Sequence, residues 1–127
     1  MRKSNNAYME AALLADYIKT DNMAKEAVKA VLGILVSALP EEDAHRLTDL
    51  LPDDLTYKKL RGHQDKITGT SPEDCIAILS DKLQISEGQA RKLMLKIISV
   101  VKIEAKNREE QIIGKLSTKW RNAFQKV

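Results

Sequence analysis

The amino-acid sequence predicts an all-α protein of about eight helices, arranged as two similar four-helix halves that pack as one duplicated domain. Helix-start signals recur along the whole chain of 127 residues. No segment alternates apolar and polar residues for long enough to predict a β-strand. Helix caps and apolar positions in the first part of the chain recur in the second part at an offset of 66 residues, which becomes 65 after one deletion, as expected for an internal duplication.

The composition is that of an ordinary globular protein, with 43% hydrophobic and 31% charged residues. The longest apolar stretch, Ala30 to Ala38, is shorter than the ~20 residues that a bilayer-spanning helix needs. Glu10 and Asp16 interrupt the apolar residues near the amino terminus, so no signal-peptide core is predicted. Because Cys75 is the single cysteine, no intrachain disulfide can form. We therefore expect a soluble, cytoplasmic protein that does not associate with membranes.

The first half of the chain begins with two predicted helices. Ser4 caps the first, which runs to about Ile18, and Thr20 or Asp21 caps the second, which runs to about Ala38. The apolar face predicted for the first helix carries Met9, Leu13, Leu14, Tyr17 and Ile18.

The third and fourth helices are predicted from a short sequence motif that occurs twice. The motif, Leu-Pro-acid-acid, begins at Leu39 and again at Leu51. Proline is tolerated in the first turn of a helix, where its missing N–H would have no partner in any case. Acidic residues in that turn face the positive end of the helix dipole. Pro40 therefore starts the third helix and Pro52 the fourth. Helical spacing between the two prolines is kept by Ala44, Leu47, Leu50 and Leu51.

The second half follows a polar loop predicted over 61–71. Ser71 and Ser86 each open a helix, because a serine hydroxyl can accept from the backbone N–H three residues on. An acid or amide at that third residue can return the bond and complete a capping box. The helices predicted for this half lie over about 72–83, 87–105, 108–116 and 118–126.

The two halves correspond position by position. The offset that separates Thr20 from Ser86 aligns these two residues, cap on cap, and aligns the apolar residues of the second helix with those of the longest helix. We predict repeats over about 5–61 and 72–126 within a single helical domain that covers 1–127. Neither half has enough core to stand alone, so the halves are expected to pack together.

A family resemblance follows from the residues at the helix boundaries of the first half, where the two Leu-Pro-acid-acid motifs stand. After an apolar helix, these residues are Leu39-Pro40-Glu41-Glu42, Ala44, Leu47, Leu51-Pro52 and Leu55. With them the chain resembles, over about Leu13 to Phe124, a bacterial helical family catalogued as domain of unknown function 2267. The resemblance implies a duplicated helical fold and supplies no activity. The second half departs from the family pattern where proline-led corners would stand, at Asn107, Arg108, Ser117 and Thr118.

The Leu-Pro-acid-acid motif is also similar, over a short stretch, to the amino-terminal helical repeats of magnesium transporters and flagellar motor-switch proteins. Those repeats are interaction scaffolds. This second likeness implies a role in binding and no chemistry.

Two groups of side chains could carry chemistry, and each has a structural alternative. Glu42 and His45 stand at i and i+3, a spacing used in metal sites, but a closed site needs more ligands than this pair supplies. A solvated helix face is the favoured interpretation. Cys75 lies in the first turns of a helix, where a thiol pKa can fall, but Glu73 and Asp74 oppose a thiolate. A small core residue is favoured there. We predict no catalytic, cofactor-binding or metal-binding residue.

The longest predicted helix carries a basic stripe. Its cations, the candidate contacts to an anion or a nucleic acid, are Arg91, Lys92, Lys96, Lys102 and Lys106. The end of the chain adds Lys115, Lys119, Arg121 and Lys126. Cations placed on one face can neutralise phosphates. The alternative is that the lysines keep an exposed face soluble, and several glutamates nearby dilute the positive field.

Trp120 and Phe124, at i and i+4, form an aromatic pair that suits either a hot spot for a partner or the core of the second half. The core is favoured because Trp120 aligns with Leu55 of the first half. The sequence thus predicts a non-enzymatic binding or regulatory module without cofactors. Its expected partner is a protein, with self-association included, and the alternative is nucleic acid bound through the basic stripe.

Overall fold

The structure, a computed structural model, describes residues 7–49, 71–106 and 112–127. These residues form helices and turns and contain no strand, so the predicted all-α class is confirmed for them. The elements are α1 (Ala7–Leu13), α2 (Asp21–Ala38), α3 (Glu41–Thr48), α5 (Pro72–Leu83), α6 (Glu87–Glu104), the 3-10 helix η2 (Ile113–Lys115) and α8 (Thr118–Gln125). The helix predicted from Pro52, the loop predicted over 61–71 up to residue 70, and the start of the helix predicted over 108–116 lie outside the described residues.

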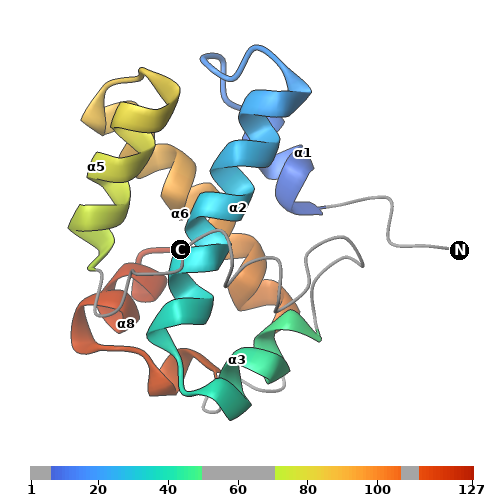
Figure 1. The fold of residues 1–127 in the computed structure, drawn as a ribbon, viewed down its shortest axis with the longest axis vertical. Helices are drawn as coiled ribbons and strands as arrows, with labels where there is room; N and C mark the ends of the chain where they lie inside the picture. Colours follow the sequence, from blue (N-terminus) through green and yellow to red (C-terminus); the bar gives the residue numbers. More distant parts are fainter. Residues whose placement is uncertain (1–6, 50–70, 107–111) are drawn as a thin grey trace, which may run out of the picture.

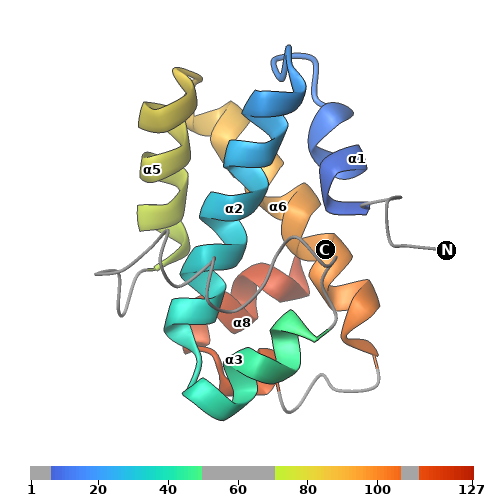
Figure 2. The ribbon, with the colours of Figure 1, turned by 45° about the vertical axis from the view of Figure 1, so that its right-hand side comes forward.

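Helix α2 forms the centre of the fold, with α1 and α5 on opposite sides of it and α6 crossing behind (Figures 1 and 2). It contacts α1, α3, α5 and α6, and α6 in turn contacts α1, α2, α5 and α8. The short helices α3 and α8 lie together at one end of the molecule (Figure 2). No helix in the described part of the chain is long and apolar enough to cross a membrane.

The helix starts are set by local capping, as predicted. The Thr20 hydroxyl accepts from the Met23 N–H at 3.1 Å at the start of α2. Ser71 with Asp74 forms a full capping box at the start of α5. Ser86 with Gln89 does the same at the start of α6. The predicted bounds of the helices at 72–83 and 87–105 are therefore confirmed to within one residue.

The predicted first helix is wrong in its length and, at Leu13 and Leu14, in its buried face. The helix α1 ends at Leu13, and turns of the i→i+3 type follow it, in which Ala15 bonds to Ala12 and Ile18 to Ala15. The side chains of Leu13 and Leu14 are 41% and 74% exposed. Ile18 is buried as predicted, and the other buried residues of α1 and its following turn are Tyr8, Ala12 and Ala15. Apolar residues stand on both faces of this segment, so spacing alone does not identify the buried ones.

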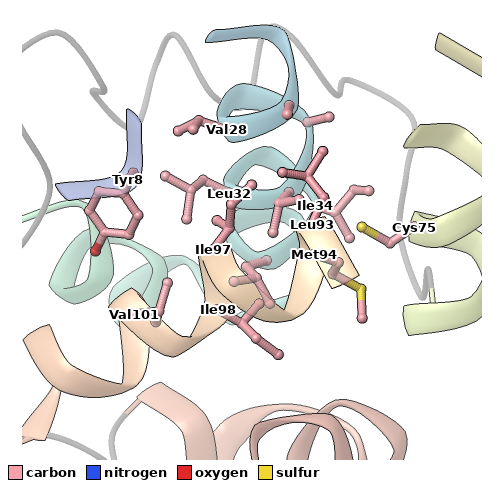
Figure 3. Packing of buried hydrophobic residues seen from close by; sticks show 14 of the residues in the cluster. Tyr8, Val28, Leu32, Ile34, Cys75, Leu93, Met94, Ile97, Ile98 and Val101 are labelled. Carbon is pink, nitrogen blue, oxygen red and sulfur yellow. The ribbon is translucent and has the colours of Figure 1, made fainter. Parts of the chain in front are cut away.

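One continuous apolar core joins the helices of the two predicted halves (Figure 3). Helix α2 is buried almost all round, since ten of its residues from Ala24 to Val36 are buried. Trp120 and Phe124 are buried in this core at 0% and 2% exposure, which confirms the interpretation of the aromatic pair as core. Helix α8 is thus anchored to the rest of the molecule through its aromatic side chains.

Gln84 ends α5 in the left-handed conformation, with φ of 57°. Glycine adopts this conformation without the steric cost that a Cβ atom imposes. We therefore expect Gln84→Gly to raise the free energy of unfolding by about 0.5–1 kcal/mol, and the β-branched Gln84→Val to lower it by about 1 kcal/mol or more. Urea unfolding followed by circular dichroism measures both. A glycine variant that is less stable than the valine variant would contradict the assigned backbone conformation.

Candidate anion-binding face

Two adjoining hollows lie along the outer side of α6, and cationic side chains surround both. Residues of three helices line the first hollow, which we call the α5–α6–α8 hollow after these helices. The second, the α6 hollow, is lined by α6 together with the last residue of the chain. Leu95 of α6 lines both hollows and so separates them.

The α5–α6–α8 hollow has a volume of about 210 Å³ and combines an apolar floor with a polar rim. The floor consists of Pro72, Met94, Leu95 and Ala123, which are buried or half-buried. The rim consists of exposed Glu73, Arg91, Lys119, Asn122 and Lys126. Of the described residues, three cations and one carboxylate therefore border the opening, and the buried floor keeps their charged groups at its edge.

Lys119 and Asn122 of α8 and its C-cap residue Lys126 reach the same hollow because of their spacing. Lys119, Asn122 and Lys126 stand at i, i+3 and i+7, which places them along one side of α8. Trp120, Ala123 and Phe124 hold the adjacent side against the core. The buried side chains of Trp120 and Phe124 thus fix which side of α8 faces α6.

The α6 hollow has a volume of about 380 Å³ and is lined by Lys92, Leu95, Lys96, Ser99 and Val127. Lys92 is exposed and Lys96 is half-buried. The Ser99 hydroxyl donates to the Lys96 carbonyl at 2.6 Å, so this side chain is already engaged with its own helix. Five cations border the two hollows: Arg91, Lys92, Lys96, Lys119 and Lys126. We call these five residues the basic face.

Two residues of the predicted basic stripe do not line either hollow. The Lys102 ammonium donates to the backbone oxygens of Phe124 and Val127, at 3.2 and 3.0 Å. A cation at this position satisfies carbonyls at the end of α8 and faces the negative end of that helix's dipole. Lys102 is therefore engaged within the fold. Lys106 is exposed and lies beyond the end of α6.

The other basic residues at the end of the chain also lie outside the hollows. Lys115 is exposed on η2. The Arg121 guanidinium donates to the Thr118 hydroxyl at 3.1 Å along the exposed side of α8. The sequence thus places three of its five candidate residues, Arg91, Lys92 and Lys96, on the face that the fold assembles.

The pair Glu42 and His45 lies on the surface of α3. Glu42 is exposed, and one of its oxygens lies 3.8 Å from a nitrogen of Arg46. Arg46 also contacts the buried Asp43 carboxylate at 2.6 Å. In the described residues, no three His, Cys, Asp or Glu side chains come together as a set that could hold a metal ion.

Cys75 is fully buried, and its side chain points from α5 toward the core cluster that contains Leu93 and Met94 (Figure 3). Burial raises the pKa of the Cys75 thiol from 9.0 to about 12. The interpretation of Cys75 as a core residue is confirmed. The folded protein holds this thiol protonated and out of reach of solvent.

We therefore expect native Cys75 to react with Ellman's reagent at pH 8 on the order of 100-fold more slowly than in urea. Because folding raises the thiol pKa, its contribution to stability is complete below pH 9 and is lost as the pH rises toward 12. The absorbance of the released thiolate, followed without urea and in urea, measures the labelling rate in each condition. Cys75→Ala supplies the blank. Rapid labelling of the native protein would contradict the burial of the thiol.

Several residues that line the α5–α6–α8 hollow are not predicted from the sequence as site residues. Asn122, Glu73 and Leu95 become part of a site only because α8 packs across α6 beside the start of α5. The i, i+3, i+7 spacing of Lys119, Asn122 and Lys126 is the signal in the sequence that identifies the α8 contribution.

The chain matches no model of a known protein family, no curated protein and no solved structure. The family resemblance stated from the residues at the helix boundaries is therefore an expectation that these comparisons leave untested. The geometry of the basic face carries the functional proposal.

Proposed function

We propose that the protein is a non-enzymatic binding module that binds nucleic acid through its basic face. One observation carries the proposal: in the described part of the chain, five cations border two adjoining hollows, and the carboxylate side chain among these lining residues is Glu73. Phosphate groups are the anions that such a face neutralises in nucleic acids, and the release of their counterions drives binding. No aromatic side chain is found among the described residues that line the hollows, so base stacking and sequence readout are not part of this proposal.

We also propose that the fold is a duplication, with α1 and α2 as the counterparts of α5 and α6. Burial supports this, since the offset from Thr20 to Ser86 places every buried residue of α6 on a buried residue of α2. The contacts support it too, since α1 packs on both α2 and α6 while α5 packs on both α6 and α2. Helices α2 and α6 have the same length, 18 residues, and each begins at a hydroxyl cap.

The basic face lies where the two proposed halves differ. Four buried residues of α2, Ala30, Gly33, Ile34 and Val36, have half-buried counterparts on α6. Those counterparts, each at the same offset along the chain, are Lys96, Ser99, Val100 and Lys102. Two of them, Lys96 and Ser99, line the α6 hollow. A strip that is covered in the first half is thus open and partly charged in the second, which favours a binding role for this side of α6.

Fluorescence anisotropy with labelled random-sequence single-stranded RNA and DNA tests the proposal. If five phosphates are neutralised, log K against log salt should have a slope of about −3.5, which corresponds to a loss of about 100-fold between about 50 and about 200 mM salt. Absence of binding at the lower salt concentration would refute nucleic-acid binding.

Charge-reversal variants locate the binding surface. We expect both Lys92→Glu with Lys96→Glu and Lys119→Glu with Lys126→Glu to reduce affinity at least about tenfold at low salt. The matched control is Lys19→Glu with Lys25→Glu, which makes the same change in net charge at exposed residues away from the hollows. A control that loses as much affinity as the test variants would attribute binding to net charge rather than to the basic face. Circular dichroism checks that each variant is folded.

A protein partner, with self-association included, is the second candidate. The exposure of Leu13 and Leu14 at the end of α1 favours it, because two neighbouring apolar side chains are left uncovered in a chain with few exposed large hydrophobic residues among those described. Sedimentation at several protein concentrations tests self-association, and Leu13→Ser with Leu14→Ser should abolish it. A salt-resistant complex that survives these changes would exclude this apolar pair as the contact.

A further inference from the structure

The rim of the α5–α6–α8 hollow has the charge that complements a doubly charged anion. Among the residues that the structure describes, Arg91, Lys119 and Lys126 contribute three positive charges to the rim, and Glu73 removes one, which leaves a net charge of +2 for these four side chains. A phosphodiester within a nucleic-acid strand carries a charge of −1. A phosphate monoester at a strand end carries about −1.5 to −2 at pH 7. The balance of charge around this hollow therefore favours the terminal phosphate over an internal one.

The shape of the hollow also suits a group at the end of a chain. Three helices wall it, and its floor is closed by buried or half-buried apolar residues. An internal phosphodiester must leave room for chain on both of its sides, whereas a terminal phosphate needs one exit. The α6 hollow, which adjoins across Leu95, supplies that exit. Lys92 and Lys96 on its border are then positioned for the next phosphates of the strand, and Leu95 and Val127 for its apolar surfaces.

The rim offers enough donors for the three terminal oxygens of a phosphate monoester. A guanidinium has five N–H donors, each ammonium has three, and the Asn122 amide adds two. Charge-assisted hydrogen bonds of this kind are stronger than neutral ones, and Arg91 can form two in parallel. Glu73 is an acceptor on the rim with a negative charge, so it opposes the bound phosphate.

We propose that the α5–α6–α8 hollow binds the terminal phosphate of single-stranded nucleic acid, so that the protein holds a strand by its phosphorylated end. This inference rests on the proposed nucleic-acid binding and specifies its substrate. The remaining strand then passes over Leu95 into the α6 hollow.

The test compares one single-stranded oligonucleotide sequence in three forms: with a 5′ phosphate, with a 3′ phosphate, and with hydroxyls at both ends. At near-physiological salt, we expect one phosphorylated form to bind about tenfold more tightly than the hydroxyl form. Equal binding of all three forms would overturn the inference and leave the proposed function standing. Absence of binding by any form, at low salt as well, would end both. If a nucleoside 5′-monophosphate competes as strongly as the phosphorylated strand, the inference is overturned, and the ligand of the hollow is a free nucleotide rather than a strand end.

Paired variants assign the preference to the hollow. Lys119→Gln with Lys126→Gln should abolish the preference for the phosphorylated end. Lys92→Gln with Lys96→Gln, the same change at the neighbouring hollow, should weaken binding of all forms and keep the preference. Glu73→Gln should strengthen binding of the phosphorylated form about threefold, while Glu87→Gln, in the first turn of α6 and outside both hollows, should not. A preference that is unchanged in the Lys119 and Lys126 variant would exclude this hollow as its source.

Discussion

Replacing Trp120 by alanine is expected to lower the free energy of unfolding by about 3–5 kcal/mol. Trp120 is fully buried, and it is the largest of the inaccessible side chains in the described core. Its removal takes a large apolar surface out of the core and leaves a cavity that the short helix α8 can close only by moving. A domain of this size has a total stability of ~5–15 kcal/mol, so the expected loss is at least about a fifth of it.

Urea unfolding followed by circular dichroism measures this loss, since the variant has no tryptophan to report by fluorescence. Gln125→Ala is the matched control, because Gln125 is exposed on the same helix and its change should stay within about 0.5 kcal/mol. If the two variants unfold at the same urea concentration, α8 does not contribute to the core. Because α8 also carries Lys119, with Lys126 as its C-cap, Trp120→Ala should weaken the proposed nucleic-acid binding along with stability.

Ile97→Ala is expected to cost about 2–5 kcal/mol, and the smaller truncation Ile97→Val about 0.5–1.5 kcal/mol. Ile97 is fully buried near the middle of α6, and its side chain lies in the cluster with Leu32 of α2 (Figure 3). The helices α2 and α6 belong to different predicted halves and are in contact. Damage at this position should therefore destabilise both halves together.

The measurement follows urea unfolding by Trp120 fluorescence and by circular dichroism on the same samples. Both signals should give one transition at one midpoint, shifted equally by the mutation, as expected for two-state unfolding. Ile103→Ala is the control, since Ile103 lies on the same helix with 70% of its side chain exposed and should change stability little. Two separated transitions, with Trp120 reporting only the second, would disprove the single shared core.

The helix starts are predictable from the sequence because capping is local chemistry. Ser71 and Ser86 each bond within three residues of themselves, so no knowledge of the tertiary structure is needed to recognise them. The buried face of α6 is predictable for a related reason, since its apolar residues recur at the helical period through a long helix. Helix α1 is too short for that signal, and both of its faces carry apolar residues.

The candidate site is predictable only in part. The stripe on α6 identifies Arg91, Lys92 and Lys96 as neighbours, since they share one helix. Lys102 belongs to the same stripe by periodicity, yet its ammonium bonds to carbonyls from residues more than twenty positions away. Which cation stays exposed and which is engaged depends on where α8 packs, and helical periodicity holds no information about that packing.

The burial of α2 has a consequence for synthesis of the chain. This helix is apolar on nearly every side, and two of its packing partners, α5 and α6, come well after it in the chain. While the ribosome extends the chain, at ~5–20 residues per second, α2 emerges seconds before these partners. During that interval α1 and α3 can pack on α2, but the apolar surface that α5 and α6 cover has no native partner, and exposed apolar surface of this kind is prone to aggregation. Folding is completed late, when α6 leaves the ribosome and the central helix is enclosed.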